Sequence, residues 1–593
     1  MEYDEYFQYP IDTAKLLAKK KRIKRYLIEN LKNPIHKKIA VLGGSTTDEL
    51  IDQMELFLLK NGISAEFYQS EYNQYWQDAI FGNPKLDSFE PDIIYIHTNW
   101  RNISDFPSIG DDKSTVQSKL NETYNYFESA WNMLRQKFSC PIIQNNFERP
   151  NYRLLGNRDI WDIHGKCNFI SRLNQMFYEF ASQNRDFYIN DIEYMASDFG
   201  ISKWNDAFYY HMYKYAVNLN AIPLVAHSVV NIIKSLYGKN KKAMALDLDN
   251  TLWGGIIGDD GQDGIAIGPE IPEGQAFAEF QQYCKVLKDI GVVLTVNSKN
   301  EEANAILGLN HPNSLLKPDD FVSIKANWQS KDVNIVESAS DLNIGVESFV
   351  FIDDNPMERD IVKTQVHGVS VPSLEDAEHY IEVIDHEGYF ETTVISEEDL
   401  RKTEMYKANK ERKKQQQTYA DYGEYLDSLQ MVAKIQPFDD ISVSRIAQLT
   451  NKSNQFNLTT MRCSEDDIRH MKDSSDYITL SGSLSDKFGD NGIVAIVSGE
   501  ISKSELHIRL WLMSCRVLKR GMENAMMDRL VDLCKTRNIR RLIGYYYPTA
   551  KNSMVRDFYK QYGFNVQEEN NDRLKWILDI ENYISQKNHI TIK

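Results

Sequence analysis

The chain has 593 residues, 42% of them hydrophobic and 26% charged, which excludes wholesale disorder and exceeds what one hydrophobic core serves. The net charge of −17 argues against nucleic acid as the main partner. Six cysteines without a CxxC pair argue against a disulfide framework and a zinc site. Because the sequence shows no signal peptide and no long apolar run, we expect a cytoplasmic protein with no membrane partner.

The first part of the chain predicts a helix followed by an α/β domain. Residues 1–32 are rich in lysine, and apolar positions such as Leu16, Ile23 and Leu27 follow helical spacing. We expect this helix to pack on the first domain; a basic binding arm is the alternative. Residues 33–238 alternate short β runs, such as KKIAVLG and EPDIIYIHT, with helix-like stretches. This alternation is typical of a parallel sheet.

Three further segments follow. Residues 239–395 repeat the α/β alternation, with the β runs AMAL, VVLTVN, FVSIKA and SFVFI. Residues 396–427 are polar and free of proline, which predicts a solvated connecting helix. Residues 428–593 begin with strands such as YITLSGSLSD and continue into amphipathic helices, which predicts an α+β domain. The sequence therefore predicts an α/β protein of three domains.

The strongest chemical signal lies directly after the run AMAL, where Asp247 and Asp249 stand two residues apart. At the end of a strand, the first carboxylate can face a substrate while the second reaches over it. The string DLDNT resembles DxDxT, the first motif of the haloacid dehalogenase (HAD) phosphatases. That resemblance implies that Asp247 attacks phosphorus to form an aspartyl-phosphate. It also implies that Asp249 protonates the leaving oxygen and then activates water.

The rest of the HAD set appears in chain order. Ser298 ends the run VVLTVNS and is placed like the phosphate-binding hydroxyl of the family. Lys331 is placed like the lysine that neutralises phosphate and aspartate charge. Lys325 competes for this role, but it lies within a strand-like run, whereas Lys331 opens a helical segment 22 residues before Asp353. We therefore prefer Lys331.

Two adjacent carboxylates, Asp353 and Asp354, follow the run SFVFI and match the metal-binding acids of the family. Mg²⁺ prefers oxygen ligands and keeps several waters. We expect Mg²⁺ to be held by Asp247, by the backbone carbonyl of Asp249 and by a carboxylate of the Asp353–Asp354 pair.

Spacing around these motifs leaves no room for a large cap domain. Asp249 and Asn297 are 48 residues apart, and Ser298 and Lys331 are 33 apart, most of which a flap, helices and a strand require. We expect an open site that admits a large substrate, such as a group carried on a protein. The alternative is a small-substrate enzyme whose neighbouring domains cover the site.

The last domain resembles the GCN5-related acetyltransferase (GNAT) fold. The resemblance rests on the turn from Arg516 to Gly521 and on the later segment from Asn552 to Phe564. It implies that Arg516, Arg520, Gly521 and Asn552 bind phosphopantetheine or a coenzyme A thioester, because backbone N–H groups at a helix start favour anions. Lys519 replaces the first glycine of that motif, which weakens the case for ordinary coenzyme A binding.

Cys515 ends a strand directly before this basic turn, where cationic neighbours lower a thiol pKa. It is a candidate acyl-accepting nucleophile; a small apolar residue that closes the strand is the alternative. Cys463 has acidic neighbours, which oppose thiolate formation, and is the weaker candidate.

The first domain carries a serine at a strand end. Ser45 in LGGSTT looks like the nucleophile turn of SGNH hydrolases, and Asn99 lies where such folds supply an oxyanion donor. A triad would also need an Asp and a His three residues apart, but Asp206 and His211 are five apart. An active esterase-like site and a degenerate binding domain both remain open.

The three parts in this order, with DLDNTLWGGIIGDDG in the centre and QLTNKSNQFNLTT near the start of the last domain, resemble the FkbH-like family of HAD subfamily IIIC. The resemblance implies that a small phosphorylated acyl group, of the phosphoglyceryl type, is dephosphorylated and transferred to an acyl carrier protein or a related acceptor. The pathway would make a secondary metabolite or a polysaccharide. The alternative is a phosphatase acting on a sugar or small phosphate, with outer domains that only bind or scaffold.

Overall fold

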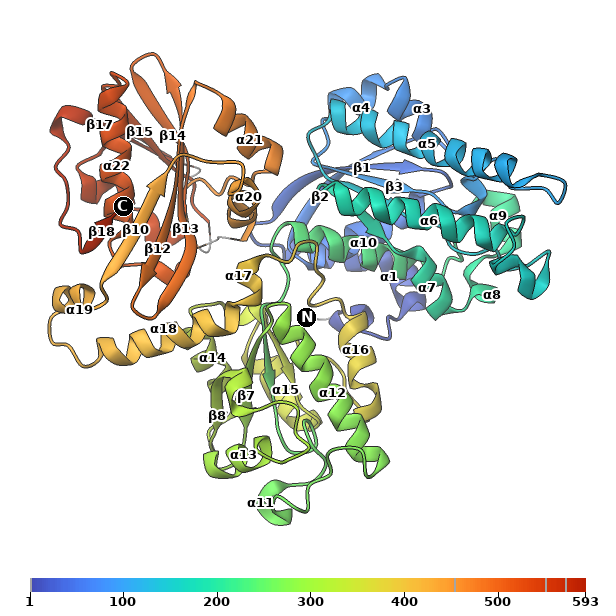
Figure 1. Cartoon of the computed structure of the whole chain (residues 1–593), viewed down its shortest axis with the longest axis horizontal. Helices are drawn as coiled ribbons and strands as arrows, with labels where there is room; N and C mark the ends of the chain where they lie inside the picture. Colours follow the sequence, from blue (N-terminus) through green and yellow to red (C-terminus); the bar gives the residue numbers. More distant parts are fainter. Residues whose placement is uncertain (1–2, 453–454, 550–551, 571–572) are drawn as a thin grey trace. The chain divides into compact units, whose positions relative to one another are not determined.

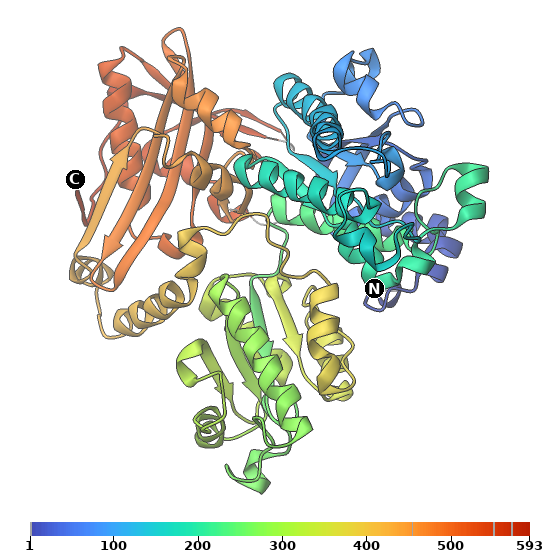
Figure 2. The same cartoon turned by 45° about the vertical axis from the view of Figure 1, so that its right-hand side comes forward.

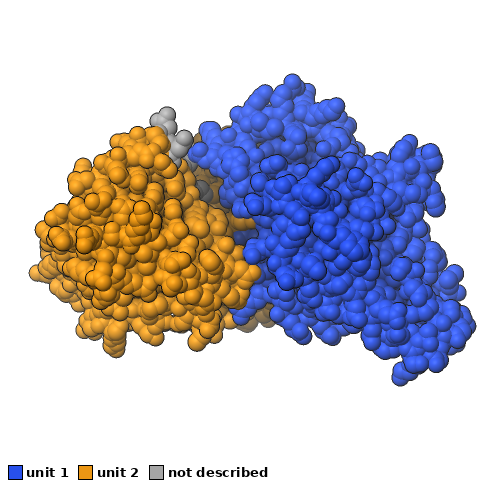
Figure 3. Space-filling view, turned by 90° about the horizontal axis from the view of Figure 1, so that it is seen from above, with its two compact units in different colours: residues 1–236 blue, residues 237–593 orange. Residues whose placement is uncertain are grey.

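The computed structural model describes residues 3–452, 455–549, 552–570 and 573–593. The chain divides into two compact units, Met1–Leu236 and Tyr237–Lys593, coloured blue and orange in Figure 3. Among the described residues, no helix combines the length and the apolar character that crossing a bilayer requires.

The first unit is built on a five-stranded parallel sheet (Figure 1). Its strands are β1 (Ile35–Gly43), β2 (Ile63–Gln69), β3 (Ile93–His97), β4 (Ile142–Asn145) and β5 (Phe187–Asn190). The order β2-β1-β3-β4-β5 is that of flavodoxin-like folds, in which ligands bind beyond the carboxyl ends of the strands. The predicted α/β class with a parallel sheet is confirmed.

Helices cover both faces of this sheet. They are η1 (Asp4–Phe7), α1 (Thr13–Glu29), α2 (Asp48–Lys60), α3 (Tyr75–Ile80), α4 (Pro84–Phe89), η2 (Trp100–Asn102), α5 (Lys113–Lys137), η3 (Gly156–Ile160), α6 (Lys166–Gln183), α7 (Ile192–Phe199), α8 (Ile201–Trp204), α9 (Ala207–Tyr213) and α10 (Ile222–Leu236). Helices α3 to α6 share one core with the strands, centred on Phe127, Trp131 and Phe177. The other face carries α2, on which α1 and α10 pack.

Helix α1 lies on α2, as expected of a packed helix. Leu16, Ile23 and Leu27 are buried at helical spacing, so the apolar stripe faces the protein. On its basic face, Lys20 Nζ lies 2.6 Å from Glu49 Oε2 of α2. Lys20 and Lys24 of this segment therefore meet acidic partners on α2.

The second unit contains two sheets, the first of which has four parallel strands (Figure 2). These are β6 (Ala243–Leu246), β7 (Val293–Ser298), β8 (Phe321–Ala326) and β9 (Phe349–Ile352), in the order β8-β7-β6-β9. The accompanying helices are α11 (Ile257–Asp260), α12 (Pro272–Asp289), α13 (Glu302–Leu309), η4 (Pro318–Asp320), α14 (Lys331–Leu342), η5 (Val346–Ser348), α15 (Pro356–Gln365), η6 (Ala377–His379) and α16 (Tyr380–His386). Between β6 and β7, a stretch described throughout, the chain forms only a short flap with α11, and then α12.

The connecting segment is not the solvated helix that its polar sequence predicts. It forms α17 (Glu397–Leu400), α18 (Lys402–Gln416) and α19 (Tyr422–Ser428). Tyr406 belongs to the core of the four-stranded sheet, and Arg412 is only 2% exposed. The Arg412 guanidinium forms a two-point ion pair with Asp486, at 2.6 and 2.7 Å, and the Asp486 side chain is fully buried. A single aromatic and a single arginine therefore anchor a helix whose average composition is polar.

This buried pair predicts a large loss of stability on losing Asp486. Asp486→Asn would leave Arg412 without its counter-charge, and it would also remove the partner of Arg520 Nη1 at 3.3 Å. Breaking a buried pair costs about 3–5 kcal/mol. We expect urea unfolding of the second unit to shift by that amount, whereas Asp490→Asn, at an exposed position of the same hairpin, should shift it by less than about 0.5 kcal/mol. Equal stability of the two variants would contradict the pair's role.

The second sheet of this unit has nine strands and is mostly antiparallel. The strands are β10 (Met431–Gln436), β11 (Phe456–Asn457), β12 (Tyr477–Asp486), β13 (Gly489–Ser502), β14 (Glu505–Met513), β15 (Arg541–Tyr546), β16 (Asn565–Glu569), β17 (Leu574–Asp579) and β18 (Ile590–Ile592). The helices are α20 (Val443–Lys452), α21 (Glu465–Asp473), η7 (Cys515–Val517), α22 (Met522–Thr536), η8 (Ser553–Val555), η9 (Phe558–Tyr562) and η10 (Ile580–Asn582). Strands β14 and β15 are parallel but pair only over Glu505–Ile508 and Arg541–Gly544. Beyond this point β14 pairs with β11 instead.

Candidate active site

Two neighbouring strands, β6 and β9, deliver the central carboxylates. Asp247 directly follows β6 and Asp353 directly follows β9, and the two are 6% and 0% exposed. Lys331, at the start of α14, lies between them. Its Nζ is 2.8 Å from Asp247 Oδ2 and 2.5 Å from Asp353 Oδ2. Burial lowers the pKa of Lys331, but the two carboxylates outweigh it and hold the pKa above its usual value.

A metal ion fits the acidic cluster. Carboxylate oxygens of Asp247, Asp353 and Asp354 lie within 4.8 Å of one another. Burial, with the charge of Asp247, raises the pKa of both Asp353 and Asp354. Asp247 Oδ1 is buried and has no hydrogen-bond partner among the described residues. An all-oxygen set with excess negative charge suits a hard divalent cation such as Mg²⁺, and this cluster includes the predicted ligands Asp247, Asp353 and Asp354.

Asp249 is held by three donors that the sequence alone did not single out. Its Oδ1 accepts from the Trp253 indole N–H at 2.9 Å and from the Ile257 amide at 3.1 Å. Its Oδ2 accepts from the Asn300 side chain at 2.9 Å. Burial raises the pKa of Asp249 despite these donors, which favours a carboxyl that can give a proton. The only signal for Asn300 was its place two residues after Ser298, at the end of β7.

The turn that carries the acids is shaped by local hydrogen bonds. Asn250 adopts a left-handed conformation with φ of 54°, and its side chain accepts from the Gly255 amide at 2.9 Å. Thr251 is fully buried, and its hydroxyl accepts from the Asp354 amide at 3.2 Å. A Cβ at Gly254 would come within 2.7 Å of Glu273 Oε1. The motif turn is thus tied to β9 on one side and packed against α12 on the other.

Ser298 and Lys325, the remaining predicted residues of this centre, lie on β7 and β8. Ser298 ends β7 and is 2% exposed. Lys325 lies on β8 and pairs with Glu337 at 2.9 Å and with Asp341 at 3.5 Å, away from the acidic cluster. Of the two candidate lysines, only Lys331 contacts the acids.

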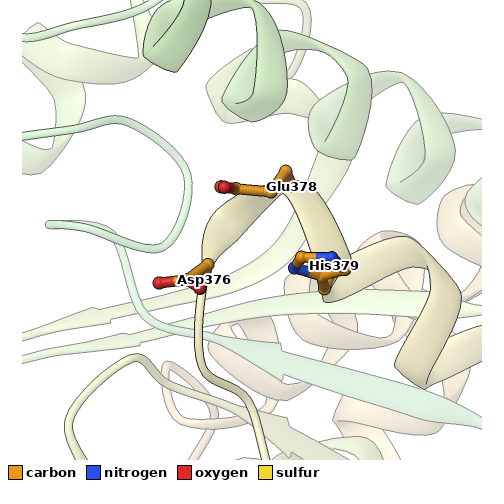
Figure 4. A group of neighbouring side chains, drawn as sticks. All are labelled: Asp376, Glu378 and His379. Atoms are coloured by element: carbon orange, nitrogen blue, oxygen red, sulfur yellow. The ribbon is translucent and has the colours of Figure 1, made fainter.

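A polar groove of about 590 Å³ adjoins this centre. Asn250 and Asp354 contribute from the centre, and the start of α12 and the segment around η6 form the walls. Figure 4 shows Asp376, which directly precedes η6, and Glu378 of η6, whose carboxylates extend from the same side of the segment. Ligand atoms of Asp376, Glu378 and His379 lie within 4.8 Å of one another, and all three residues are exposed.

The basic turn of the last domain already has anionic partners. Arg516 Nη2 lies 2.8 Å from Glu398 Oε2, and Arg520 Nη1 lies 3.3 Å from the buried Asp486. The Lys519 amide donates to Glu523 Oε1 at 3.1 Å. A cofactor phosphate would have to displace these three carboxylates.

Asn552 and Gly521 also have structural roles within the last domain. The Asn552 amide group donates to Asn457 O and Tyr547 O, both at 2.9 Å. It therefore joins the end of β11 to the residue after β15, in the region where β14 and β15 no longer pair. Gly521, with φ of 88°, caps the start of α22. The residues predicted to bind phosphopantetheine or coenzyme A are therefore engaged in contacts within the chain.

Of the two candidate thiols, one can be described. The side chain of Cys515 lies outside the described part of the structure. Cys463 is buried, and burial raises its pKa to about 12, so its thiol is unreactive at neutral pH.

The serine of the first unit stands without a triad. Ser45 follows β1 and is 4% exposed, and its Oγ has no hydrogen-bond partner among the described residues. Asp206 caps α9 by accepting from the Tyr209 amide, and His211 is exposed and packs against its neighbour Tyr210. Asn99 caps η2. The structure brings none of these residues into a hydrogen-bonded relay with Ser45.

A buried acid of the first unit escaped the sequence analysis. Glu148 follows β4, is fully buried, and accepts from the Trp100 amide at 3.3 Å. Burial raises its pKa to about 7. When an acid has a higher pKa in the folded protein than in the unfolded chain, the free energy of unfolding falls as pH rises above the unfolded-state pKa. The fall is complete once the pH exceeds the folded-state pKa.

Glu148→Gln should therefore stabilise the first unit more at pH 8 than at pH 5. At pH 8 the expected gain in the free energy of unfolding approaches about 3 kcal/mol, because burial raises the pKa of Glu148 by roughly two units or more. Hydrogen-exchange protection of β3 and β4 amides, corrected for intrinsic rates at each pH, measures it. Glu122→Gln, at an exposed position of α5, should give the same small effect at both pH values. A pH-independent effect of Glu148→Gln would contradict a raised pKa.

Known proteins resemble different parts of the chain. Residues 38–234 match the family model described as FkbH, N-terminal domain. A search of curated proteins finds no match. The solved N-terminal part of protein BF1531 from Bacteroides fragilis, which contains a phosphatase domain and is complexed with Mg, is 29% identical. That match covers 63% of this chain and 99% of that chain, with a TM-score of 0.59.

Weaker matches involve about a quarter of the chain. The ribosomal-protein-S18-alanine N-acetyltransferase from Escherichia coli is 13% identical over 26% of this chain and 98% of that chain, with a TM-score of 0.21. The PaiA N-acetyltransferase from Thermoplasma acidophilum, solved with coenzyme A, is 13% identical over 25% of this chain and 98% of that chain, also at 0.21. These scores are too low to assign a fold or an activity. The match to the FkbH N-terminal domain and the likeness to BF1531 together support the resemblance to FkbH-like proteins with a HAD phosphatase domain.

Proposed function

We propose that this protein is a Mg²⁺-dependent HAD-type phosphatase that works through an aspartyl-phosphate on Asp247. The observation that carries the proposal is the cluster of the buried Asp247 and Asp353, both paired with Lys331, with the partly exposed Asp354. Asp247 Oδ1 has no hydrogen-bond partner among the described residues. The likeness to BF1531, whose solved part contains a phosphatase domain and Mg, supports the same assignment.

The residues divide the reaction into two displacements. Asp247 Oδ1 attacks phosphorus, the bond from phosphorus to the leaving oxygen breaks, and the carboxyl of Asp249 gives its proton to that oxygen. Asp249, now a carboxylate, then takes a proton from water. The water oxygen attacks phosphorus, the bond to Asp247 breaks, and inorganic phosphate leaves. Trp253 and Asn300 hold the Asp249 carboxyl throughout.

Charge in this centre must be balanced before a phosphate dianion can enter. Mg²⁺, when bound by Asp247, Asp353 and Asp354, supplies positive charge for the phosphoryl oxygens. Lys331 supplies one further positive charge within hydrogen-bond distance of the nucleophile. Ser298, at the end of β7, is the side chain that we assign to hydrogen bonding of the phosphoryl group.

The test is phosphate release from p-nitrophenyl phosphate by the full chain during a Mg²⁺ titration. We expect activity to rise from background to saturation with Mg²⁺ and to disappear in excess EDTA, because the three carboxylates repel a phosphate without a cation. Ca²⁺ should inhibit, because it does not keep octahedral geometry. Undiminished turnover in EDTA would overturn the proposal.

The finer form of the proposal concerns substrate and acceptor. The resemblance to FkbH-like proteins favours a phosphoglyceryl-type acyl group, transferred to an acyl carrier protein in secondary-metabolite or polysaccharide biosynthesis. Cys515 is then the candidate acyl acceptor. Formation of a thioester adduct by intact-mass measurement, lost in Cys515→Ala, tests this form. The second candidate, a phosphatase of small phosphate esters or sugar phosphates, is favoured by the groove beside the active centre.

A further inference from the structure

The groove beside Asp354 has no role in the reaction steps described above. It has a volume of about 590 Å³, which is large enough for a small organic group. Its lining includes Asp354, whose carboxylate belongs to the same cluster as Asp247. In that cluster, Asp247 is more than nine-tenths buried, and its Oδ1 lacks a hydrogen-bond partner within the described part of the chain. A group in the groove would therefore lie next to a phosphoryl group attacked by Asp247.

The groove has walls that are tied to the catalytic turn. Tyr380 is 2% exposed, and its hydroxyl donates to Asn250 O at 3.2 Å. Phe277, on α12, is 3% exposed and gives the groove an apolar wall. Tyr380 thus connects one wall to the DLDNT turn, and a Cβ at Gly254, which follows that turn, would come within 2.9 Å of Phe277 Cε2. The groove therefore keeps a defined position relative to the nucleophile.

The lining is strongly acidic. Five of its eleven residues carry a carboxylate, and no lysine, arginine or histidine belongs to the described lining. The five are Glu273, Asp354, Glu375, Asp376 and Glu378.

The lysine and the arginine that contact the catalytic acids are already engaged, and His379, which has ligand atoms within 4.8 Å of those of Asp376 and Glu378, is not part of the lining. Lys331 pairs with Asp247 and Asp353, and Arg359 donates to the backbone oxygens of Asp353 and Asp354, both at 2.7 Å. A cleft lined by one sign of charge raises the local concentration of the opposite sign and disfavours like charge. The groove therefore disfavours a leaving group with a carboxylate and favours one with an ammonium group.

We propose that this groove binds the leaving group of the phosphatase substrate and selects a small phosphate ester that carries a positively charged amine, such as an amino sugar or amino alcohol phosphate. This inference rests on the proposed phosphatase function. The ammonium group would meet the carboxylates of Glu375, Asp376 and Glu378, while the carbon skeleton contacts Phe277.

The experiment compares esters that differ in one amine. Phosphate release by the full chain with Mg²⁺ is measured for glucosamine 6-phosphate, glucose 6-phosphate and N-acetylglucosamine 6-phosphate. We expect kcat/KM for the amine to exceed that for the other two by at least about tenfold at low salt, because several exposed charge contacts act together. The advantage should shrink at 0.5 M NaCl, where charges are screened within a few ångströms.

Variants tie the preference to the groove. Glu378→Gln should reduce the ratio of kcat/KM between the amine and glucose 6-phosphate to within about threefold. The matched control Glu279→Gln, at an exposed position of α12 outside the lining, should keep the parent ratio. The removed carboxylate is exposed, and an unchanged melting temperature verifies that the Glu378 variant folds.

The outcomes separate the two proposals. Release of phosphate from p-nitrophenyl phosphate but from none of the three esters would overturn the role of the groove, and release from neither kind of ester, with or without Mg²⁺, would overturn the phosphatase function. Release at equal rates from all three, or a ratio unchanged in Glu378→Gln, would overturn only the role of the groove. Calorimetry with Mn²⁺ adds a further arm. A second bound ion that is lost in His379→Ala, with equal rates for the three esters, would make the groove a cation site and overturn the amine preference.

Discussion

Asp247→Asn should reduce phosphate release by at least about 10³-fold while the protein stays folded. The amide keeps the shape of the carboxylate but lacks the nucleophilic oxygen pair, and losing a covalent nucleophile costs orders of magnitude. Lys331 keeps its contact with Asp353 at 2.5 Å, so the buried lysine retains a counter-charge. Turnover of p-nitrophenyl phosphate at saturating Mg²⁺ measures the effect, and circular dichroism measures the fold.

A matched carboxylate-to-amide change serves as the control. Asp263→Asn, at an exposed position of the loop before α12, should leave turnover within about twofold of the parent. If Asp247→Asn hydrolysed the ester at a rate comparable to Asp263→Asn, another residue would be the nucleophile. Mass spectrometry of quenched parent enzyme should also find one added phosphoryl group, and the Asn variant should not.

Asp353→Asn should weaken Mg²⁺ binding by at least about tenfold. At an effective dielectric constant of 20, one unit charge about 4 Å from another contributes roughly 4 kcal/mol, of which water and neighbouring ligands recover a part. Asp353 is fully buried, so less water is available there than at the partly exposed Asp354. Isothermal titration calorimetry with Mg²⁺ measures the affinity directly, without reference to turnover.

The second acidic group of the same domain provides the comparison. Asp376→Asn removes one carboxylate from the exposed Asp376, Glu378 and His379 group and should leave the Mg²⁺ affinity of the catalytic cluster within about twofold. If Asp376→Asn, and not Asp353→Asn, abolished binding, the metal would belong to the groove. If both variants bound Mg²⁺ like the parent, neither group would be the site.

Sequence patterns predicted the candidate site best where catalytic side chains directly follow buried strands. The carboxyl ends of parallel strands meet at one edge of a sheet. Two acids that directly follow two buried runs can therefore be predicted from the sequence to lie at the same edge. Asp247 after β6 and Asp353 after β9 follow this rule, because β6 and β9 are neighbours. The parallel α/β class could be predicted for the same reason, since buried strands read as short apolar runs.

Residues whose role depends on distant partners could not be placed in this way. The sequence shows that Arg516 and Arg520 are basic, but Glu398 and Asp486, more than 30 positions away, decide that these charges are already paired. Likewise, Arg412 sits in a polar helix, and only the position of β12 makes it a buried anchor. Burial and ion pairing are properties of the packed chain, and local composition does not contain them.

By itself, the sequence of this protein determined the strand and helix alternation, the DLDNT turn and the order of the catalytic candidates, because these depend on local periodicity and on residue type. The tertiary structure showed that Lys331, which the sequence already favoured over Lys325, contacts the acids. Only the tertiary structure decided that Asn300 and Trp253 hold Asp249. It also decided that the Ser45 hydroxyl has no hydrogen-bond partner among the described residues and that five carboxylates line a groove beside the centre. The physical reason is that hydrogen bonds, ion pairs and fields act over a few ångströms in space, and the fold brings together groups that lie far apart in the chain.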